Sequence, residues 1–263
     1  MKLPSAPFNG RYKIEFQARG HKYLVDGRKE PTPSVSNISG WKDSVERLLQ
    51  WHGKNILANL AASCNKNGSV SMRDLEALKG WKDNSAAERG TRVHKMCEDF
   101  ILGNAVPEPE DEMDRNSYGH FITWYNKYGK DYEVLAVERM LYNPDDDYIG
   151  TCDFIGQHKD TGRILILDYK TSGRMQPSYF FQVAGYAQAL ELEMFELNLG
   201  GPEIDLGVLR LPTEDKNGKN FDFRVAEEYS NAAEVAYGGW NNCLALYRRT
   251  KEMTAQMKEI KHD

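Results

Sequence analysis

The sequence has few cysteines and lacks several signatures that would assign it to a class at once. Its four cysteines lie far apart and form no Cys-x-x-Cys pair, which argues against a zinc or iron–sulfur site and for free thiols in a reducing cytoplasm. No apolar run of roughly 18 residues occurs, so no transmembrane helix is predicted. The N-terminal residues lack an apolar segment, so we expect no secretory signal. No Gly-x-x-x-x-Gly-Lys-Ser/Thr motif is present, so no ATP-driven motor is expected.

The composition is that of a protein with a substantial hydrophobic core. Hydrophobic residues make up 40% and aromatic residues 11% of the 263 residues, enough for one large domain or a domain with insertions. The net charge of −5 gives no global sign of nucleic-acid binding. Residues 1–55, however, carry ten lysines and arginines against five acidic residues. Such a basic segment fits local contacts to a polyanion, and it fits ordinary solvated surface charge equally well.

The segment of residues 149–170, IGTCDFIGQHKDTGRILILDYK, predicts a β-hairpin with charged residues near one end. Apolar runs on both sides of an Asp-Thr-Gly turn give its two strands. Asp168 and Lys170 are two residues apart on the second strand, so they project from the same face. A register that brings Asp153 beside Asp168 would place two carboxylates and an ammonium in one patch. An isolated Asp-x-Lys pair is more commonly an ordinary surface pair.

Adjacent carboxylates do not both stay ionised without compensation. A divalent cation held by oxygen ligands is the usual compensation. A nearby lysine can then stabilise developing negative charge or help to activate a water molecule.

A second pattern predicts a helix over residues 86–102, which Ser85 can cap and Gly103 can end. Gly90 inside it costs about 1 kcal/mol against alanine, which indicates a close approach by some other group. His94 and Glu98 are four residues apart and share a face. A lone helical histidine is more commonly a surface or core residue than a ligand.

The rest of the chain alternates short strands and helices. The patterns predict a hairpin over residues 11–30, broken helices over 41–80, a helix over 116–130, a strand over 134–142, a helix over 177–192, a hairpin of 204–211 with 221–225, and a helix from 226 onward. The strand over 134–142 carries Glu138. The helix over 177–192 carries Gln182 and Tyr186 at i, i+4 spacing.

Four motifs occur in an order that resembles RecB-like PD-(D/E)XK nucleases. They are His94 in RGTRVH, Asp153 in GTCDFIG, Asp168 and Lys170 in LDYKTS, and Gln182 with Tyr186 in QVAGYAQAL. The pattern KYLVDGRKEPTPSVS, followed by broken helices and RGTRVH, is similar to the mitochondrial genome maintenance exonuclease type and its phage relatives. The resemblance covers roughly residues 20–250 and is loose outside the motifs. The cysteine cluster of the iron–sulfur branch is missing, which makes that branch a poorer model.

The resemblance implies an α/β (α+β) fold of the restriction-endonuclease-like kind, with a mixed central sheet flanked by helices. One nuclease domain would span residues 1–263, with an N-terminal hairpin in 1–40, an arch-like helical insertion in 41–84, the core in 85–225 and a C-terminal helix in 226–263. Asp153, Asp168 and Lys170 would be catalytic, and His94, Asp153, Asp168 and the Tyr169 carbonyl would bind the metal. Gln182 and Tyr186 would orient the site and the DNA, Thr171 and Ser172 would approach phosphate, and Glu98 and Glu138 would be accessory.

The function implied is a metal-dependent DNA exonuclease that prefers single-stranded DNA with a free end. The cofactor would be Mg²⁺ or Mn²⁺, with no iron–sulfur cluster and no ATP, and an imidazole ligand favours Mn²⁺. The expected partners are DNA and a strand-annealing or single-strand-binding protein, and no contact with a membrane is expected. The expected location is the cytoplasm, which would be the host cell's cytoplasm if a phage encodes the chain.

Two alternatives stay open at this point. One is a lambda-type double-strand 5′ exonuclease acting with a strand-annealing protein. The other is a non-catalytic DNA-binding or inhibitor protein on a decayed nuclease fold, against which the intact Asp153, Asp168 and Lys170 argue.

Overall fold

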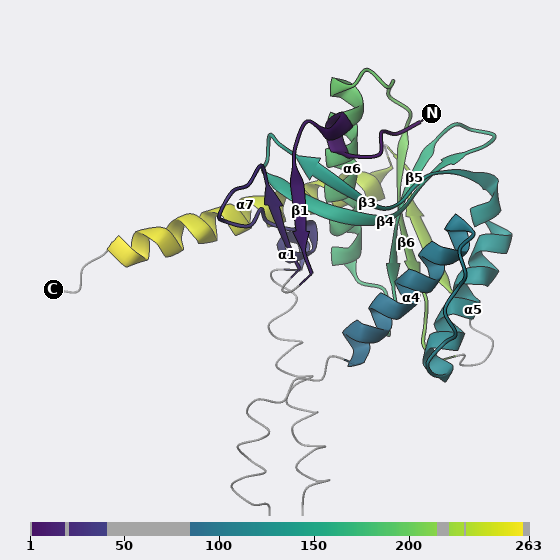
Figure 1. Cartoon of the computed structure of the whole chain (residues 1–263). Helices are drawn as coiled ribbons and strands as arrows, with labels where there is room; N and C mark the ends of the chain where they lie inside the picture. The colour runs from purple at the N-terminus through teal and green to yellow at the C-terminus, as the bar shows by residue number, and fades with distance from the viewer. Residues whose placement is uncertain (1, 19–20, 41–84, 215–220, 229, 260–263) are drawn as a thin grey trace, which may run out of the picture.

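The computed structural model describes residues 2–18, 21–40, 85–214, 221–228 and 230–259 (Figure 1). The predicted insertion of residues 41–84 lies outside the described residues and stays a prediction. Within the described ranges, no helix is long and apolar enough to cross a membrane.

A five-stranded mixed sheet in the order β3-β4-β5-β6-β7 forms the centre of the molecule. Its strands are β3 (Tyr132–Asn143), β4 (Tyr148–His158), β5 (Ile164–Lys170), β6 (Ile204–Arg210) and β7 (Asp222–Ala226). Neighbouring strands are antiparallel except β5 and β6. These two run parallel because helix α6 (Pro177–Glu196) returns the chain from the end of β5 to the start of β6.

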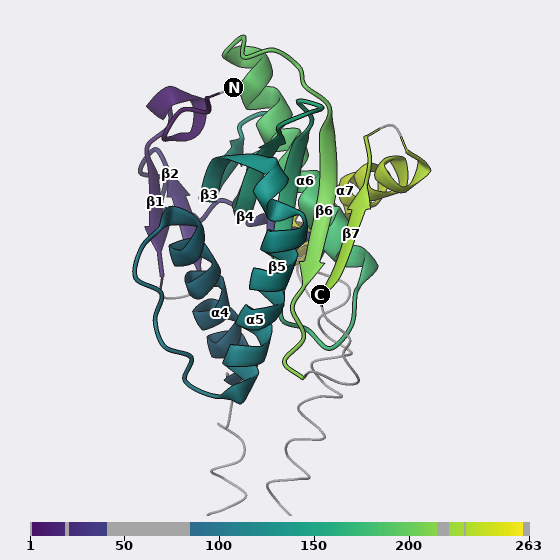
Figure 2. The ribbon, with the colours of Figure 1, turned by 90° about the vertical axis from the view of Figure 1, so that its right-hand side faces the viewer.

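Helices cover both faces of this sheet, and β5 shows how the sequence specifies both layers. Its isoleucines, at positions 164 and 166, pack with α6 and α7 (Asn231–Glu259). Its leucines, at 165 and 167, pack with α4 (Ser85–Leu102) and α5 (Glu112–Lys127). A strand buried on both faces has a continuous apolar run in its sequence. The two layers are seen in Figure 2, with α4 and α5 on the near side of the sheet. The predicted fold, a mixed sheet flanked by helices, is confirmed.

The predicted N-terminal hairpin is confirmed as β1 (Ile14–Gln17) paired with β2 (Lys22–Val25). It packs against β3 and β4 through a small cluster of buried side chains: Tyr23, Val25, Tyr142 and Ile149. The remaining short elements are η1 (Pro7–Gly10), α1 (Val35–Ser39) and η2 (Gly129–Asp131).

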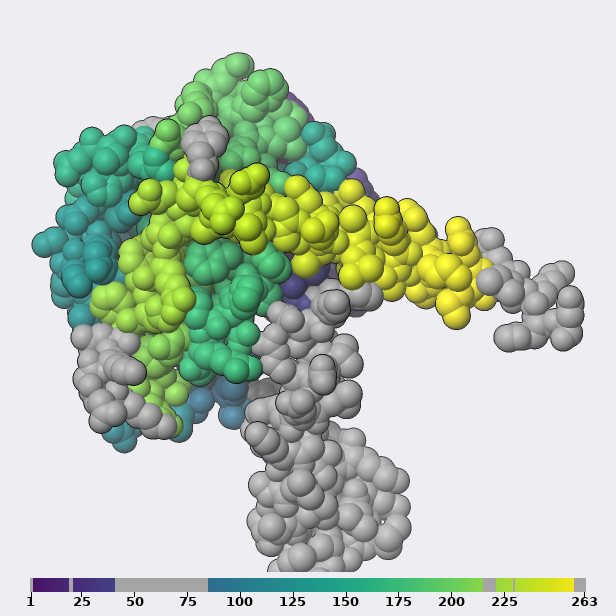
Figure 3. All heavy atoms as spheres, turned by 180° about the vertical axis from the view of Figure 1, so that it is seen from behind, coloured from purple at the N-terminus to yellow at the C-terminus, as the bar shows by residue number. Residues whose placement is uncertain are grey.

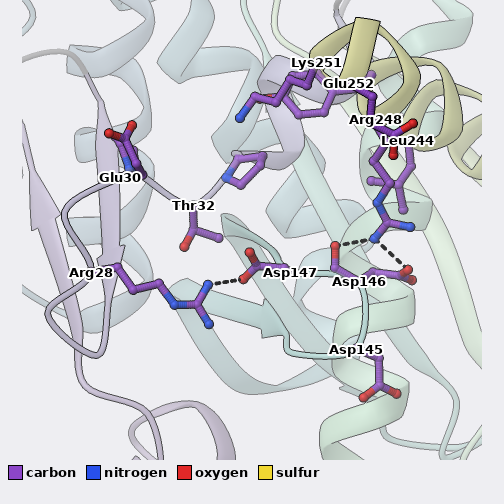
Figure 4. Close-up of a pocket in the computed structure, with 13 residues that line it drawn as sticks. Arg28, Glu30, Thr32, Asp145, Asp146, Asp147, Leu244, Arg248, Lys251 and Glu252 are labelled. Carbon is purple, nitrogen blue, oxygen red and sulfur yellow. Dashed lines mark hydrogen bonds and ion pairs between the residues drawn. The ribbon is translucent and has the colours of Figure 1, made fainter. Parts of the chain in front are cut away.

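The turn between β3 and β4 is a charged junction where three elements meet (Figure 4). Arg28, which follows β2, lies 2.6 Å from Asp147, and Arg248 of α7 lies 2.9 Å from Asp146. These ion pairs connect the hairpin and α7 to the same turn. Helix α7 crosses the back of the molecule and then extends beyond its body (Figure 3).

Helix α5 ends at Lys127 and α6 at Glu196, a few residues from the predicted ends at 130 and 192. Two helix starts also differ from the predicted ones. The helix predicted over residues 116–130 is α5, which begins at Glu112 because the Asp111 side chain caps it, accepting a hydrogen bond of 2.8 Å from the Asp114 N–H. The last helix begins at Asn231 rather than at residue 226, because Ala226 still pairs with Leu206 as the end of β7.

Helix α6 packs closely on α7 at a glycine, and this contact provides a test of the core. A Cβ at Gly185 would lie 2.9 Å from ring atoms of the fully buried Trp240. We expect Gly185→Ala to lower the free energy of unfolding by about 1–3 kcal/mol because the ring has nowhere to move. The control, Gly119→Ala in α5, meets nothing within 4 Å and should be neutral or stabilising by up to about 1 kcal/mol. Urea denaturation measures both, and equal effects would contradict the packing argument.

Candidate active site

The buried carboxylate of Asp153 lies where β4 and β5 separate. The last residue pair of their ladder is Phe154 with Leu167, so Asp153 and Asp168 come next, opposite one another. The Asp153 carboxylate accepts a hydrogen bond from the Tyr169 N–H through Oδ2 and lies 3.1 Å from His94 Nδ1 through Oδ1. Asp153 therefore links α4 to the end of β5.

Asp168 and Lys170 form a second group on the α6 side of the same strand end. Lys170 Nζ lies 2.5 Å from Asp168 Oδ2. Gln182 of α6 connects the two, because its Nε2 donates to Asp168 Oδ1 at 3.0 Å and its Oε1 accepts from Lys170 at 3.1 Å. The same Nε2 also donates to the Tyr186 hydroxyl at 2.8 Å. The structure thus brings together the predicted Asp-x-Lys pair and the two predicted α6 residues.

Glu138 joins the site from β3 through an unusual backbone conformation. Its φ is 48°, in the left-handed region that residues other than glycine seldom adopt. The β3–β4 ladder pairs residues on both sides of it but omits Glu138 and Asp153. Strain of this kind persists only where the surrounding structure enforces it, and it concentrates at functional sites. The result is a carboxylate beside His94 and Asp153.

Close packing of these groups shifts their pKa values. Burial lowers the pKa of His94, but the charge and hydrogen bond of Asp153 outweigh it, and the pKa rises from 6.5 to about 9. Part of the Glu138 side chain stays exposed, but burial of the rest and the charge of Asp153 raise its pKa to about 8. Burial and the Asp153 charge likewise raise the pKa of Asp168 to about 6, although Lys170 opposes the shift. Burial alone would raise the pKa of Asp153, but His94 and Lys170 keep it below its usual value.

These side chains fit a divalent cation. One ligand atom from each of His94, Glu138 and Asp153 lies within 4.8 Å of the others. Asp168 Oδ2 is buried and receives no well-directed hydrogen bond from the described residues. One imidazole with two or more carboxylates is a set of ligands that suits Mn²⁺. Mg²⁺ also binds carboxylates but has less preference for a nitrogen ligand. Of the predicted ligands, Asp168 is engaged by Lys170 and Gln182, and the Tyr169 carbonyl stays a prediction.

An open cavity of about 490 Å³ adjoins His94 and Lys170. Thr171 and Ser172 line it, as does Gly90, where a Cβ would lie 3.5 Å from the Thr171 hydroxyl. The glycine therefore borders the cavity. An alanine Cβ at this position would make only an ordinary van der Waals contact, so the described residues do not show the close approach that the sequence indicates. Glu98, the other accessory candidate, pairs with Lys95 at 3.0 Å one helical turn beyond His94.

Several cavity residues have no predicted role, and Arg89 and Thr213 are two of them. Arg89 lies one residue before Gly90, within the quoted RGTRVH motif. Its buried Nε makes no hydrogen bond in the described part of the chain, but it lies 3.6 Å from the Asp114 carboxylate in an ion pair. Its place in that motif was the available signal. Thr213 follows β6 and has no motif around it, so only the fold brings it to the cavity.

No family model and no curated protein matches the chain. Among solved structures, it is similar to an alkaline exonuclease from Laribacter hongkongensis, with 13% identity and a TM-score of 0.33 over 66% of this chain and 87% of that one. It is also similar to a protein from Eubacterium rectale described as a putative exonuclease, with 11% identity and a TM-score of 0.37 over 75% and 82% of the two chains. Both likenesses are too distant to carry an argument about this chain.

The pKa of His94 leads to a pH test on metal-free protein. Because the pKa of His94 is about 9 in the fold and 6.5 normally, its charged pairing with Asp153 stabilises fully below about pH 6.5 and is lost as the pH rises to about 9. We expect His94→Asn to lower the unfolding free energy by about 2 kcal/mol at about pH 6 and by much less at about pH 9.5.

Urea denaturation in the presence of a chelator measures this difference. In an Asp153→Asn background, which removes the largest of the charges that raise the His94 pKa, the His94→Asn effect should depend much less on pH. An effect of equal size at both pH values in the parent protein would contradict the ion pair.

Proposed function

We propose that this chain is a metal-dependent DNA nuclease that hydrolyses phosphodiester bonds. The observation that carries the proposal is the convergence of Asp153, Asp168 and Lys170 at one strand end, with His94 and Glu138 beside them. Asp153 and Asp168 are buried carboxylates with shifted pKa values, and their partners His94 and Lys170 line a cavity. Such a combination is typical of a catalytic site. The order of the sequence motifs, and not the distant structural likenesses, adds support for DNA as the substrate.

The residues divide into two roles. His94, Glu138 and Asp153 would hold Mg²⁺ or Mn²⁺, which when bound polarises a phosphoryl oxygen and lowers the pKa of water. Lys170 keeps its proton, because burial lowers its pKa less than the charges of Asp168 and Asp153 raise it. An ammonium at this position can stabilise negative charge that develops on the phosphate oxygens.

Gln182 determines where that ammonium lies. Its amide oxygen faces Lys170 and its amide nitrogen faces Asp168, so it orients both groups at once. Tyr186 accepts a further hydrogen bond from the same nitrogen, and this fixes which way the amide points. Preorganised groups of this kind need no rearrangement during the reaction.

The finer part of the proposal is an exonuclease that prefers single-stranded DNA with a free end. The resemblance of the N-terminal segment to the mitochondrial genome maintenance type supports it. So does the position of the cavity, which Ala86 and Ala87 line at the first turn of α4. That turn directly follows the predicted insertion of residues 41–84.

Substitution of the site residues tests the reaction. Asp153→Asn and Lys170→Met should each lower the rate of DNA hydrolysis by about 10²–10⁴ while leaving the protein folded. The control Lys127→Met changes an exposed lysine of α5 and should keep the parental rate. A gel assay with labelled DNA and Mn²⁺ measures all three. Parental activity in either site variant would show that the site is assigned wrongly.

The shape of the substrate provides a separate test. A linear single-stranded oligonucleotide should be degraded, and the same oligonucleotide ligated into a circle should survive, because the circle has no end to enter the site. Blunt duplex should be cut slowly, since fraying must come first. Efficient cutting of the circle would rule out the exonuclease mode. Faster cutting of duplex than of single strand would favour the double-strand 5′ exonuclease acting with a strand-annealing protein.

A further inference from the structure

A second pocket, of about 610 Å³, is lined by the loop that follows β5 and by residues of α6, β6 and β7. Three arginines and a single acidic residue line it: Arg174, Arg210, Arg224 and Asp222. Apolar side chains of Met175, Pro177 and Phe180 form part of its wall. The lining therefore carries an excess of positive charge, although the whole chain has a net charge of −5.

The one carboxylate in this lining does not satisfy the three guanidinium groups. Arg224 occupies both oxygens of Asp222, at 3.1 and 3.3 Å. Arg210 Nε lies 3.8 Å from the same carboxylate, beyond hydrogen-bonding distance, and is buried with no hydrogen-bond partner among the described residues. A buried donor without a partner costs free energy and calls for an explanation such as a bound ion. Here that donor belongs to a guanidinium, whose planar fork matches phosphate.

The start of α6 adds to this positive potential. Gln176 is the N-cap, yet its side chain makes no capping hydrogen bond, and both Gln176 and Pro177 line the pocket. The first N–H groups of a helix and its dipole favour an anion at this end. The helix end and the three arginines thus act on the same space.

The pocket lies directly beside the candidate active site. Lys170 and Arg210 are register partners on neighbouring parallel strands, which lie about 4.8 Å apart. The Lys170 ammonium also lies 5.2 Å from the centre of the Tyr179 ring, in the first turn of α6. Thr171 and Ser172 line the first cavity, and the next residues of the same loop line this pocket. A nucleic-acid strand that runs from the first cavity past Lys170 would therefore reach the arginines next.

We propose that this arginine pocket binds a backbone phosphate of the nucleic-acid strand, next to the phosphate that the proposed function places at Lys170. The inference rests on the proposed function and adds a substrate subsite to it. Contacts to phosphate are independent of base sequence, so the pocket positions the strand without selecting its sequence. The apolar side chains of the pocket wall can contact the sugar and base that accompany this phosphate.

Binding of a labelled single-stranded oligonucleotide, measured by fluorescence anisotropy in a chelator at several salt concentrations, tests the pocket. Arg174→Gln and Arg224→Gln should each weaken binding several-fold and reduce the slope of log K against log salt by about 0.7, the value for one lost phosphate contact. Both residues are exposed, so the variants should melt at the parental temperature. Asp222→Asn, which removes the competing carboxylate, should tighten binding.

The matched control is Arg249→Gln, which changes an exposed arginine of α7 and should keep the parental slope. Parental slopes and affinities in Arg174→Gln and Arg224→Gln, in a protein that still cleaves DNA, would overturn the pocket and leave the proposed function standing. A parent protein that neither cleaves nor binds DNA would overturn both.

Discussion

Burial of the Asp153 carboxylate is the constraint on which the rest of the site depends. A buried charge is tolerated only where partners replace its water. Those partners come from two elements: His94 from α4, and the Tyr169 N–H and the nearby charge of Lys170 from β5. Their positions place α4 against the sheet and set how β4 and β5 separate at their ends. The side chain therefore helps to position α4 and the strand ends as well as serving the chemistry, and Asn, which keeps its shape without its charge, should preserve the fold.

The site compensates its charges unequally, and this has a functional consequence. Asp168 has Lys170 and Gln182 as fixed partners, whereas Glu138 adds a carboxylate next to Asp153 with a pKa raised to about 8. Near neutral pH, the metal-free cluster of His94, Glu138 and Asp153 holds protons that a divalent cation would displace. Affinity for the cation should therefore increase with pH. The arginine pocket beyond Lys170 has the opposite imbalance, an excess of cations that suits phosphate.

Much of this arrangement could be predicted from the sequence, because local sequence patterns specify the strands and helices that bear the site residues. The ILIL run of β5 predicts a central strand, and the adjacent Asp-x-Lys places two charges on one face of its end. The left-handed backbone of Glu138 could not be predicted, since tertiary packing imposes it and no turn residue marks it. The start of α5 was missed because Asp111 acts as its cap within an acidic stretch that resembles a loop. The arginines of the second pocket come from a loop and two strands, and their spacing forms no motif.

We propose that His94, Glu138 and Asp153 form one divalent-cation site beside Lys170. Anomalous diffraction from crystals grown with Mn²⁺ tests it most directly, because the signal locates the metal without assumptions about the ligands. We expect one strong anomalous peak in coordinating contact with His94, Glu138 and Asp153. Well-ordered side chains with no peak between them, or a peak held by other residues, would contradict it.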